Sequence, residues 1–152
     1  MFIFGCQQSQ QAPANHTPDN ALNDYSAFAP AKIKIIGLTE FVDNSNLKIY
    51  VDLIDSFGSR VKSPVVIRFE LYEYVPRSAE PKGRRIFLWP DIDLTSAEVN
   101  NAHWRDFLRA YEFNMKIDFE LDAKQTYILQ GLCRTSSGSC LDATKQLTFG
   151  KN

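Results

Sequence analysis

The chain lacks most of the features that identify an enzyme or a membrane-spanning protein. No stretch of its 152 residues approaches the roughly 18 consecutive apolar residues that a membrane-spanning helix needs. Only two histidines are present, His16 and His103, and neither a Gly-x-Ser-x-Gly motif nor a glycine-rich phosphate loop occurs. We therefore expect a protein that is not an enzyme, with no catalytic residues, no metal site and no cofactor.

The chain also lacks an excess of charge of either sign. Lysine and arginine number 17 against 18 acidic residues, which gives a net charge of −1. A balanced surface exerts no general attraction on phosphate backbones or anionic membranes. We expect no nucleic-acid partner.

The first six residues indicate the compartment. Met1 to Cys6 read as the end of the apolar core of a signal peptide, followed by a cysteine. The order Ile3-Phe4-Gly5-Cys6 resembles the bacterial lipobox, in which a small residue precedes the cysteine that receives the lipid. The resemblance implies a lipid on Cys6, which would anchor the protein to a membrane of the cell envelope. Gln7 is not the aspartate associated with inner-membrane retention in enterobacteria, so the outer membrane is favoured. The alternative is an exposed thiol on an intracellular terminus.

The composition then divides the chain into three parts. Residues 7–31 are rich in Gln, Asn, Ser, Ala and Pro, with few large apolar residues. Such a segment cannot bury enough surface to offset its ordering entropy, which predicts a disordered tether. Residues 1–6 are then the residual signal peptide and lipidation site, and residues 32–150 form the folded domain.

The folded part alternates apolar and polar residues, the period of a half-buried strand. Leu47 to Leu53 and Val65 to Leu71 are the clearest runs, and a similar parity runs from Phe107 to Ile117. Turn signals separate them, among them Asp55-Ser-Phe-Gly58 and a final hairpin turn at Thr135 to Gly138.

One helical segment interrupts the strands. Thr95 and Glu98 form the pattern of a capping box, which predicts a short helix from Ser96 to about His103. About seven strands and one helical crossover predict a mainly β fold, an antiparallel two-sheet β-sandwich.

The run from Tyr50 to Val75 is similar to immunoglobulin-like and transthyretin-like bacterial domains. Its core, Ser63 to Tyr72, also resembles the corresponding strand of type VI secretion outer-membrane lipoproteins. That second resemblance covers about ten residues, and the later part of the chain departs from that family's pattern. It implies a membrane-complex lipoprotein as an alternative function.

Cys133 and Cys140 flank the last hairpin turn. A six-residue loop between them would place them opposite each other, where two Cβ atoms approach disulfide distance. In an oxidising envelope we expect a disulfide that contributes on the order of 2–3 kcal/mol. The alternative is two small buried thiols.

An aromatic and basic segment is the strongest candidate for a binding surface. Exposed tryptophan beside arginine is typical of protein-binding hot spots and of sugar-stacking platforms. The alternative is that the tryptophans close the open end of the sandwich beneath the arginines. The residues concerned are Trp89, Trp104, Arg84, Arg85, Arg105 and Arg109.

Acidic pairs at strand ends offer a calcium site as a weaker alternative. Asp91 with Asp93, and Asp52 with Asp55, could supply oxygen ligands, but no complete ligand run is present. The preferred hypothesis is a lipid-anchored, non-catalytic binding or scaffolding module of the cell envelope, with a protein partner favoured over a glycan. A carbohydrate-binding module is the rival class. An enzyme would require a cleft that joins His103 to a carboxylate.

Overall fold

The computed structural model describes residues 26–150. The lipidation site expected at Cys6 and most of the expected tether therefore lie outside the described residues. Within them, strand β1 begins at Pro30, two residues before the predicted start of the domain.

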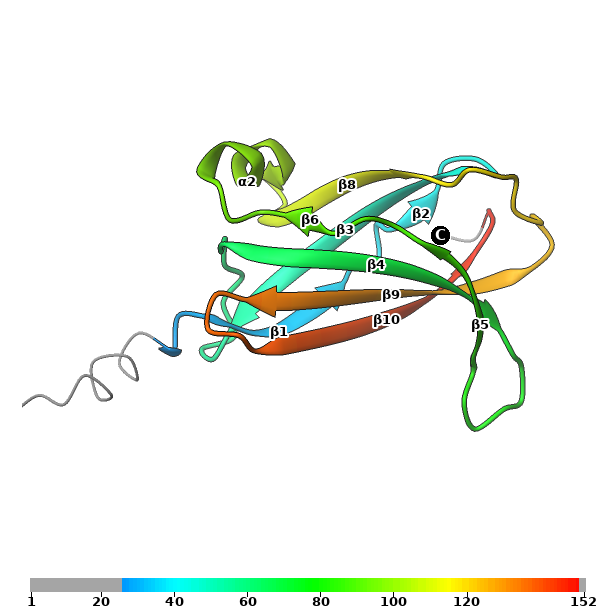
Figure 1. Cartoon of the computed structure of the whole chain (residues 1–152), viewed down its shortest axis with the longest axis horizontal. Helices are drawn as coiled ribbons and strands as arrows, with labels where there is room; N and C mark the ends of the chain where they lie inside the picture. Colours follow the sequence, from blue (N-terminus) through cyan, green and yellow to red (C-terminus); the bar gives the residue numbers. More distant parts are fainter. Residues whose placement is uncertain (1–25, 151–152) are drawn as a thin grey trace, which may run out of the picture.

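Two antiparallel sheets of five strands each pack face to face (Figure 1). The first sheet has the order β1-β3-β8-β7, with β2 also paired to β3; the second has the order β10-β9-β4-β5, with β6 also paired to β4. The first sheet comprises β1 (Pro30–Ile35), β2 (Glu40–Phe41), β3 (Asn46–Asp55), β7 (Trp104–Arg105) and β8 (Ala110–Lys116). The second comprises β4 (Val65–Tyr74), β5 (Lys82–Leu88), β6 (Ile92–Asp93), β9 (Thr126–Thr135) and β10 (Cys140–Thr148).

This architecture confirms the predicted mainly β, two-sheet sandwich. The strands β1, β3, β4, β5, β8, β9 and β10 have six or more residues each, which matches the predicted number of about seven. The two-residue strands β2, β6 and β7 were not predicted, because two residues are too short to show a period.

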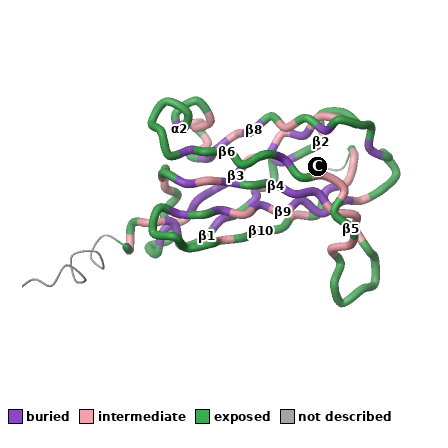
Figure 2. Tube along the Cα trace, in the orientation of Figure 1, coloured by how far each residue is buried: buried purple, intermediate pink, exposed green. Residues whose placement is uncertain are grey.

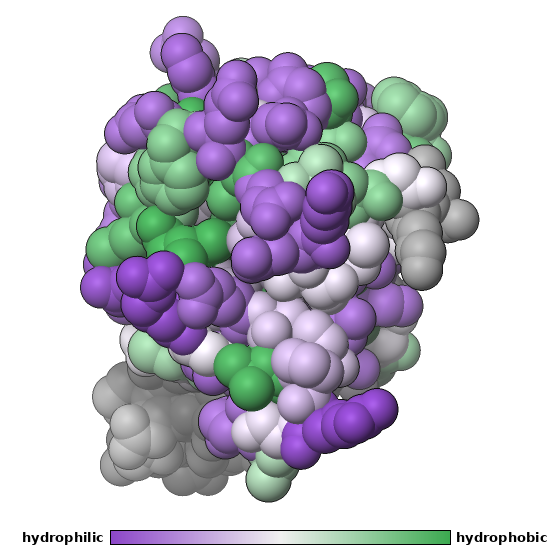
Figure 3. Space-filling model, turned by 90° about the vertical axis from the view of Figure 1, so that its right-hand side faces the viewer, coloured by the Kyte–Doolittle hydropathy of each residue, from purple (hydrophilic) through white to green (hydrophobic). Residues whose placement is uncertain are grey.

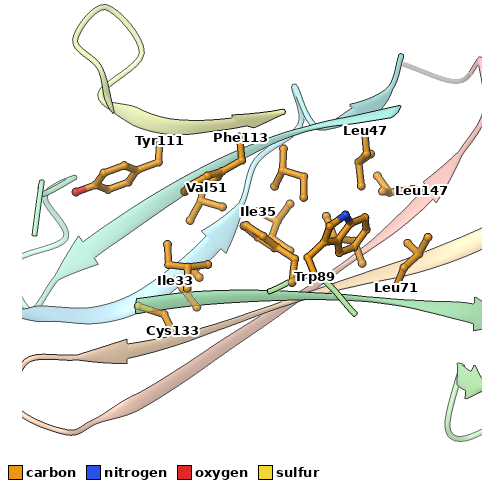
Figure 4. Close-up of a cluster of buried hydrophobic side chains, with 14 of the residues drawn as sticks. Ile33, Ile35, Leu47, Val51, Leu71, Trp89, Tyr111, Phe113, Cys133 and Leu147 are labelled. Atoms are coloured by element: carbon orange, nitrogen blue, oxygen red, sulfur yellow. The ribbon is translucent and has the colours of Figure 1, made fainter. Parts of the chain in front are cut away.

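The alternating residues of the long strands form the core. Leu47, Ile49, Val51 and Leu53 of β3 are each at most 1% exposed, and the same holds for Val65, Ile67, Phe69 and Leu71 of β4. Figure 2 shows the buried positions along the long strands of both sheets, among them β3, β4 and β9. Figure 4 shows Leu47, Val51 and Leu71 among the side chains directed into the space between the sheets. Burial of this apolar surface is the main stabilising contribution.

Helix α2 (Ala97–His103) connects β6 of the second sheet to β7 of the first, so the helical crossover is confirmed. Its cap lies one residue later than predicted. The Ser96 hydroxyl accepts a hydrogen bond from the Val99 N–H at 3.3 Å. Thr95 instead donates to the Asp93 carboxylate from its N–H at 2.9 Å and its hydroxyl at 2.6 Å. This local bond removes Thr95 from the capping position.

The parity predicted for Phe107 is wrong, since this side chain is 83% exposed. The strand is interrupted by a tight turn between β7 and β8, in which the Arg109 N–H donates to the Asp106 carbonyl at 3.2 Å. Arg109 adopts a left-handed conformation at φ 51°, and the alternation restarts at Ala110. None of the described helices is long and apolar enough to cross a bilayer.

Candidate functional site

Three exposed phenylalanines lie on segments at one end of the molecule, the end at which β1 begins, β3 ends and β8 begins (Figure 1). Phe28, Phe57 and Phe107 are 63%, 66% and 83% exposed, the highest values among the exposed large hydrophobic residues described. We refer to these three residues and the loops that carry them as the aromatic end. Exposed apolar side chains concentrated in one region are typical of interaction surfaces.

The segment before β1 is fastened to the loop after β3. The Ser56 N–H donates to the Ala27 carbonyl at 3.2 Å, and the rings of Phe28 and Phe57 lie 5.3 Å apart. The Asp55 carboxylate accepts hydrogen bonds from the N–H groups of Phe57 and Ser59, both at 2.9 Å. Phe57 therefore stands at the tip of a hydrogen-bonded turn, as the Asp55-Ser-Phe-Gly58 signal predicted.

Arg60 joins this loop to the turn that carries Phe107. Its guanidinium donates to the Leu108 carbonyl at 3.1 Å, and the Arg109 guanidinium donates to the Arg60 carbonyl at the same distance. The three phenylalanines are thus held on two connected loops and on the segment before β1. A preorganised surface loses little conformational entropy on binding.

A buried carboxylate holds Arg60 in this position. The Arg60 Nε lies 3.0 Å from Asp52 Oδ2, and the Asp52 side chain is only 2% exposed. Asp52 Oδ1 has no hydrogen-bond partner among the described residues. Desolvation raises the pKa of Asp52, while the charges of Arg60 and Lys34 act in the opposite direction.

The sequence pattern did not predict that exposed phenylalanines would lie at the aromatic end. Phe28 fell in the predicted tether and Phe107 in a predicted inward parity. A large apolar residue at the tip of a polar turn, as at Phe57, is the one signal that was available.

Of the two predicted tryptophans, Trp89 belongs to the core. It is 4% exposed, its Nε1 donates to the Lys116 carbonyl at 2.7 Å, and its ring packs 5.0 Å from that of Phe87. The expectation that Trp89 contributes to a binding surface is wrong, because the large ring fills the interior between the sheets. Figure 4 shows the Trp89 ring between the two sheets.

Trp104 is half-buried. Its Nε1 donates to the Asp106 carboxylate at 2.8 Å, its ring packs 5.0 Å from that of Tyr111, and Lys62 Nζ lies 5.7 Å from its centroid. Trp104 therefore supports the base of the turn that carries Phe107.

The four predicted arginines are divided between the two sheets. On β5, Arg84 pairs with Glu73 at 2.8 Å and Arg85 with Glu70 at 3.4 Å. On β7, Arg105 pairs with Glu112 at 3.2 Å, and Arg109 belongs to the aromatic end. The structure does not bring them together as one surface.

The expected disulfide between Cys133 and Cys140 is wrong, since both thiols are free. Cys140 pairs across the hairpin with Arg134, and Cys133 pairs with Leu141. This register places the two thiols on opposite faces of the sheet, because successive side chains of a strand alternate. Cys133 lies in the core (Figure 4), where burial raises its pKa to about 11, and Cys140 is exposed.

The groups considered for catalysis or metal binding have other roles in the structure. Among the described residues, no three His, Cys, Asp or Glu side chains are grouped so as to hold a metal ion. Asp91 pairs with Arg68 at 2.6 Å, and this hydrogen bond lowers its pKa. Hydrogen bonds from Thr95 lower the pKa of Asp93. His103 Nδ1 lies 3.1 Å from the Glu112 carbonyl oxygen.

No family model matches the chain, and no curated protein matches it. Among solved structures, the chain is similar to the superoxide reductase (neelaredoxin) from Ignicoccus hospitalis, with 13% identity, a TM-score of 0.47, and coverage of 87% of this chain and 92% of that one. A variant of the same protein, in which a lysine replaces a threonine, matches with 12% identity, the same TM-score, and coverage of 87% and 91%.

Both neighbours are named as enzymes, which contradicts the expectation of a non-catalytic binding or scaffolding module. That expectation is withdrawn, together with its secretion-complex and carbohydrate-binding versions. At this identity and TM-score, the likeness assigns no activity, substrate or metal to this chain.

Proposed function

We propose that this protein is a lipid-anchored protein of the bacterial cell envelope that works at the membrane surface, with its aromatic end in contact with the bilayer. The observation that carries the proposal is that Phe28, Phe57 and Phe107 lie on segments at the end of the molecule where the described chain begins (Figure 1). The lipobox-like Cys6 lies 20 residues before Ser26 in the sequence. The outer membrane is favoured on the basis of Gln7.

The anchor alone would not orient the domain. Twenty residues of chain reach at most about 70 Å when fully extended, so a lipid on Cys6 is compatible with many orientations. Exposed aromatic rings prefer the boundary between headgroups and acyl chains. Inserting three of them would select the orientation in which the aromatic end meets the lipid.

The energy available matches a tethered domain. Burying one phenylalanine side chain contributes about 1.5–3 kcal/mol, so three partly exposed rings provide roughly 5 kcal/mol. A tether gives an effective concentration of about 1 mM, at which roughly 4 kcal/mol is enough for half occupancy. The basic side chains of Arg60, Lys62 and Arg109 lie in the same loops and favour anionic headgroups.

The opposite end of the molecule is a weaker candidate. Figure 3 faces that end and shows a hydrophobic area bordered by hydrophilic residues. Its Phe119 is 46% exposed and lies 6.0 Å from the ring of Phe87, so its ring is partly covered already. The described chain does not begin there.

Vesicle binding of the full-length, unacylated Cys6→Ser variant tests the proposal. We expect it to sediment with vesicles of phosphatidylethanolamine and phosphatidylglycerol. Adding Phe57→Asp and Phe107→Asp should reduce the bound fraction at least tenfold, because both rings are replaced by charges. Phe119→Asp is the matched control and should leave binding unchanged.

Equal vesicle binding by the variant with Phe57→Asp and Phe107→Asp and by the Phe119→Asp control would refute the membrane contact. The contact would also be refuted if these phenylalanines bound a protein partner in the absence of lipid. Mass spectrometry of the native protein tests the anchor separately. An unmodified Cys6 would remove the anchor while leaving the vesicle result interpretable.

A further inference from the structure

A shallow depression of about 200 Å³ lies on the outer face of the second sheet. Its lining includes Val66 and Arg68 from β4, Leu132 and Arg134 from β9, Cys140 from β10, and Asp91 from the segment between β5 and β6. In the strand register Arg134 lies between Val66 and Cys140, and Arg68 lies beside Leu132. Apolar and cationic side chains therefore alternate across one small area, and two carboxylates border it, Asp93 beside Val66 and Asp142 beside Leu132.

The two arginines of this depression differ in their hydrogen bonds. Arg68 is held by Asp91 through two hydrogen bonds, from Nε at 2.6 Å and from Nη2 at 3.2 Å. Arg134 is exposed and makes no hydrogen bond or ion pair within residues 26–150. The pKa of Asp91 is lowered chiefly by the hydrogen bond from Arg68 and that of Asp93 by the hydrogen bonds from Thr95, and the charge of Arg134 acts in the same direction on both carboxylates. Arg134 is therefore the cation of this group whose guanidinium is held by no direct hydrogen bond, and its N–H groups can turn toward a ligand.

We propose that this depression binds an amphipathic anion, with the phosphate or carboxylate on Arg134 and an apolar chain over Val66 and Leu132. A guanidinium forms paired hydrogen bonds with either anion. The volume is below that of typical sites for drug-sized ligands, so it suits one anionic group and a short length of chain.

The depression lies at the same end of the molecule as the aromatic end. Strand β4 begins, β9 ends and β10 begins there (Figure 1). A membrane lipid is therefore one source of such an anion, and a free amphiphile is the other. The site itself stands independently of the proposed function, and only the lipid source rests on it.

Cys140 provides a reporter within the site. Its thiol lines the depression and is exposed, whereas Cys133 is 1% exposed and has a pKa raised to about 11. In the full-length Cys6→Ser variant, iodoacetamide at neutral pH should therefore alkylate Cys140 and not Cys133. Mass spectrometry measures its rate.

We expect n-octyl phosphate, kept below its micelle concentration, to slow alkylation of Cys140 at least fivefold. Inorganic phosphate and n-octyl glucoside at the same concentration should each slow it less than twofold. Arg134→Gln should abolish the protection. Arg77→Gln, at an exposed arginine in the loop between β4 and β5, is the matched control and should keep it.

Absence of protection by octyl phosphate would overturn the proposal, and so would equal protection in the two arginine variants. Protection by inorganic phosphate alone would refute the apolar half of the site. Because Arg134 has no bond to lose, its variant should melt within a few degrees of the parent, which excludes unfolding as a cause.

The same readout separates the two sources. Vesicles containing phosphatidylglycerol should protect Cys140 only while Phe57 and Phe107 are present, if the ligand is a membrane lipid. Octyl phosphate should protect it in both cases. If vesicles fail to protect Cys140 from alkylation while octyl phosphate still protects it, the result refutes the membrane contact and not the site. If neither protects Cys140, the site is refuted.

Discussion

Tyr111→Phe should destabilise the protein by about 2–3 kcal/mol, because a single hydroxyl connects three segments beneath the aromatic end. Tyr111 is fully buried. Its hydroxyl accepts a hydrogen bond from the Ser63 N–H at 2.9 Å and lies 3.0 Å from Asn100 Oδ1, to which it donates. Asn100 Nδ2 in turn donates to the carbonyls of Ser63 and Leu94 at 2.9 and 2.8 Å.

The magnitude follows from the partners left behind. Without the hydroxyl, the buried Asn100 oxygen and the half-buried Ser63 N–H lose their partners, and each unsatisfied buried group costs about 1–3 kcal/mol. Water can reach Ser63, so the sum falls in the lower part of that range. For a domain of this size, a loss of about 2–3 kcal/mol lowers the melting temperature by roughly 5–10 °C.

Thermal unfolding followed by circular dichroism measures this shift. Tyr74→Phe is the control, since no hydrogen bond involves the Tyr74 hydroxyl among the described residues, and it should change stability by less than about 0.5 kcal/mol. Equal shifts in the two variants would show that the hydrogen-bond network does not hold these segments together.

Three further predictions concern the buried charge of Asp52, the core residue Trp89 and the two cysteines of the last hairpin. Because desolvation raises the pKa of Asp52 in the folded state, its carboxyl binds protons more tightly when the protein is folded. The stability of the parent relative to the Asp52→Asn variant should therefore fall as pH rises from 4 to 7. A rise in this relative stability would contradict the desolvation argument. Trp89→Phe should lower the free energy of unfolding by about 2 kcal/mol in urea titrations, through a lost hydrogen bond to Lys116 and a cavity. Cys140→Ser should leave the melting temperature of oxidised protein within about 1 °C, whereas loss of a disulfide with Cys133 would remove about 2–3 kcal/mol.

The alternation of apolar residues predicted the sandwich because it is a local property of each strand. Leu47 to Leu53 and Val65 to Leu71 carry the period of two without reference to any partner, and two sheets are needed to bury such faces. The helical crossover was also readable, because its capping signals lie within four residues of one another. The exact cap was not, since Asp93 competes for Thr95.

The sequence pattern could not predict the pairing register of strands β9 and β10. The last hairpin closes with the Thr135 N–H bonded to the Ser139 carbonyl at 2.9 Å and with Gly138 at φ 86°. This closure sets Cys140 opposite Arg134. A register one residue different would have set the two cysteines face to face, and composition does not distinguish the two turns.

The exposed site was hidden for a related reason. Phe107 follows the parity of Tyr111 and Phe113, and the turn between them contains neither glycine nor proline. Arg109 takes the left-handed conformation instead, which L-residues with a long side chain rarely adopt. A parity argument fails wherever a turn without glycine or proline intervenes.

Asp52 and the three phenylalanines are best explained together. A charged carboxylate that is 2% exposed and has one unpaired oxygen reduces stability relative to an apolar residue of the same volume. The three exposed rings likewise contribute little to folding, since they remain largely in water. Arg60 connects the two features, because it binds Asp52 on one side and the Leu108 carbonyl beside Phe107 on the other. We infer that this end is shaped for a contact outside the domain, and Asp52→Asn tests the link: it should weaken vesicle binding severalfold, through a loosened Arg60, even at a pH where it does not lower the melting temperature. If the Asp52→Asn variant loses the Arg60 contacts but binds vesicles as the parent does, the buried charge has no role in the surface contact.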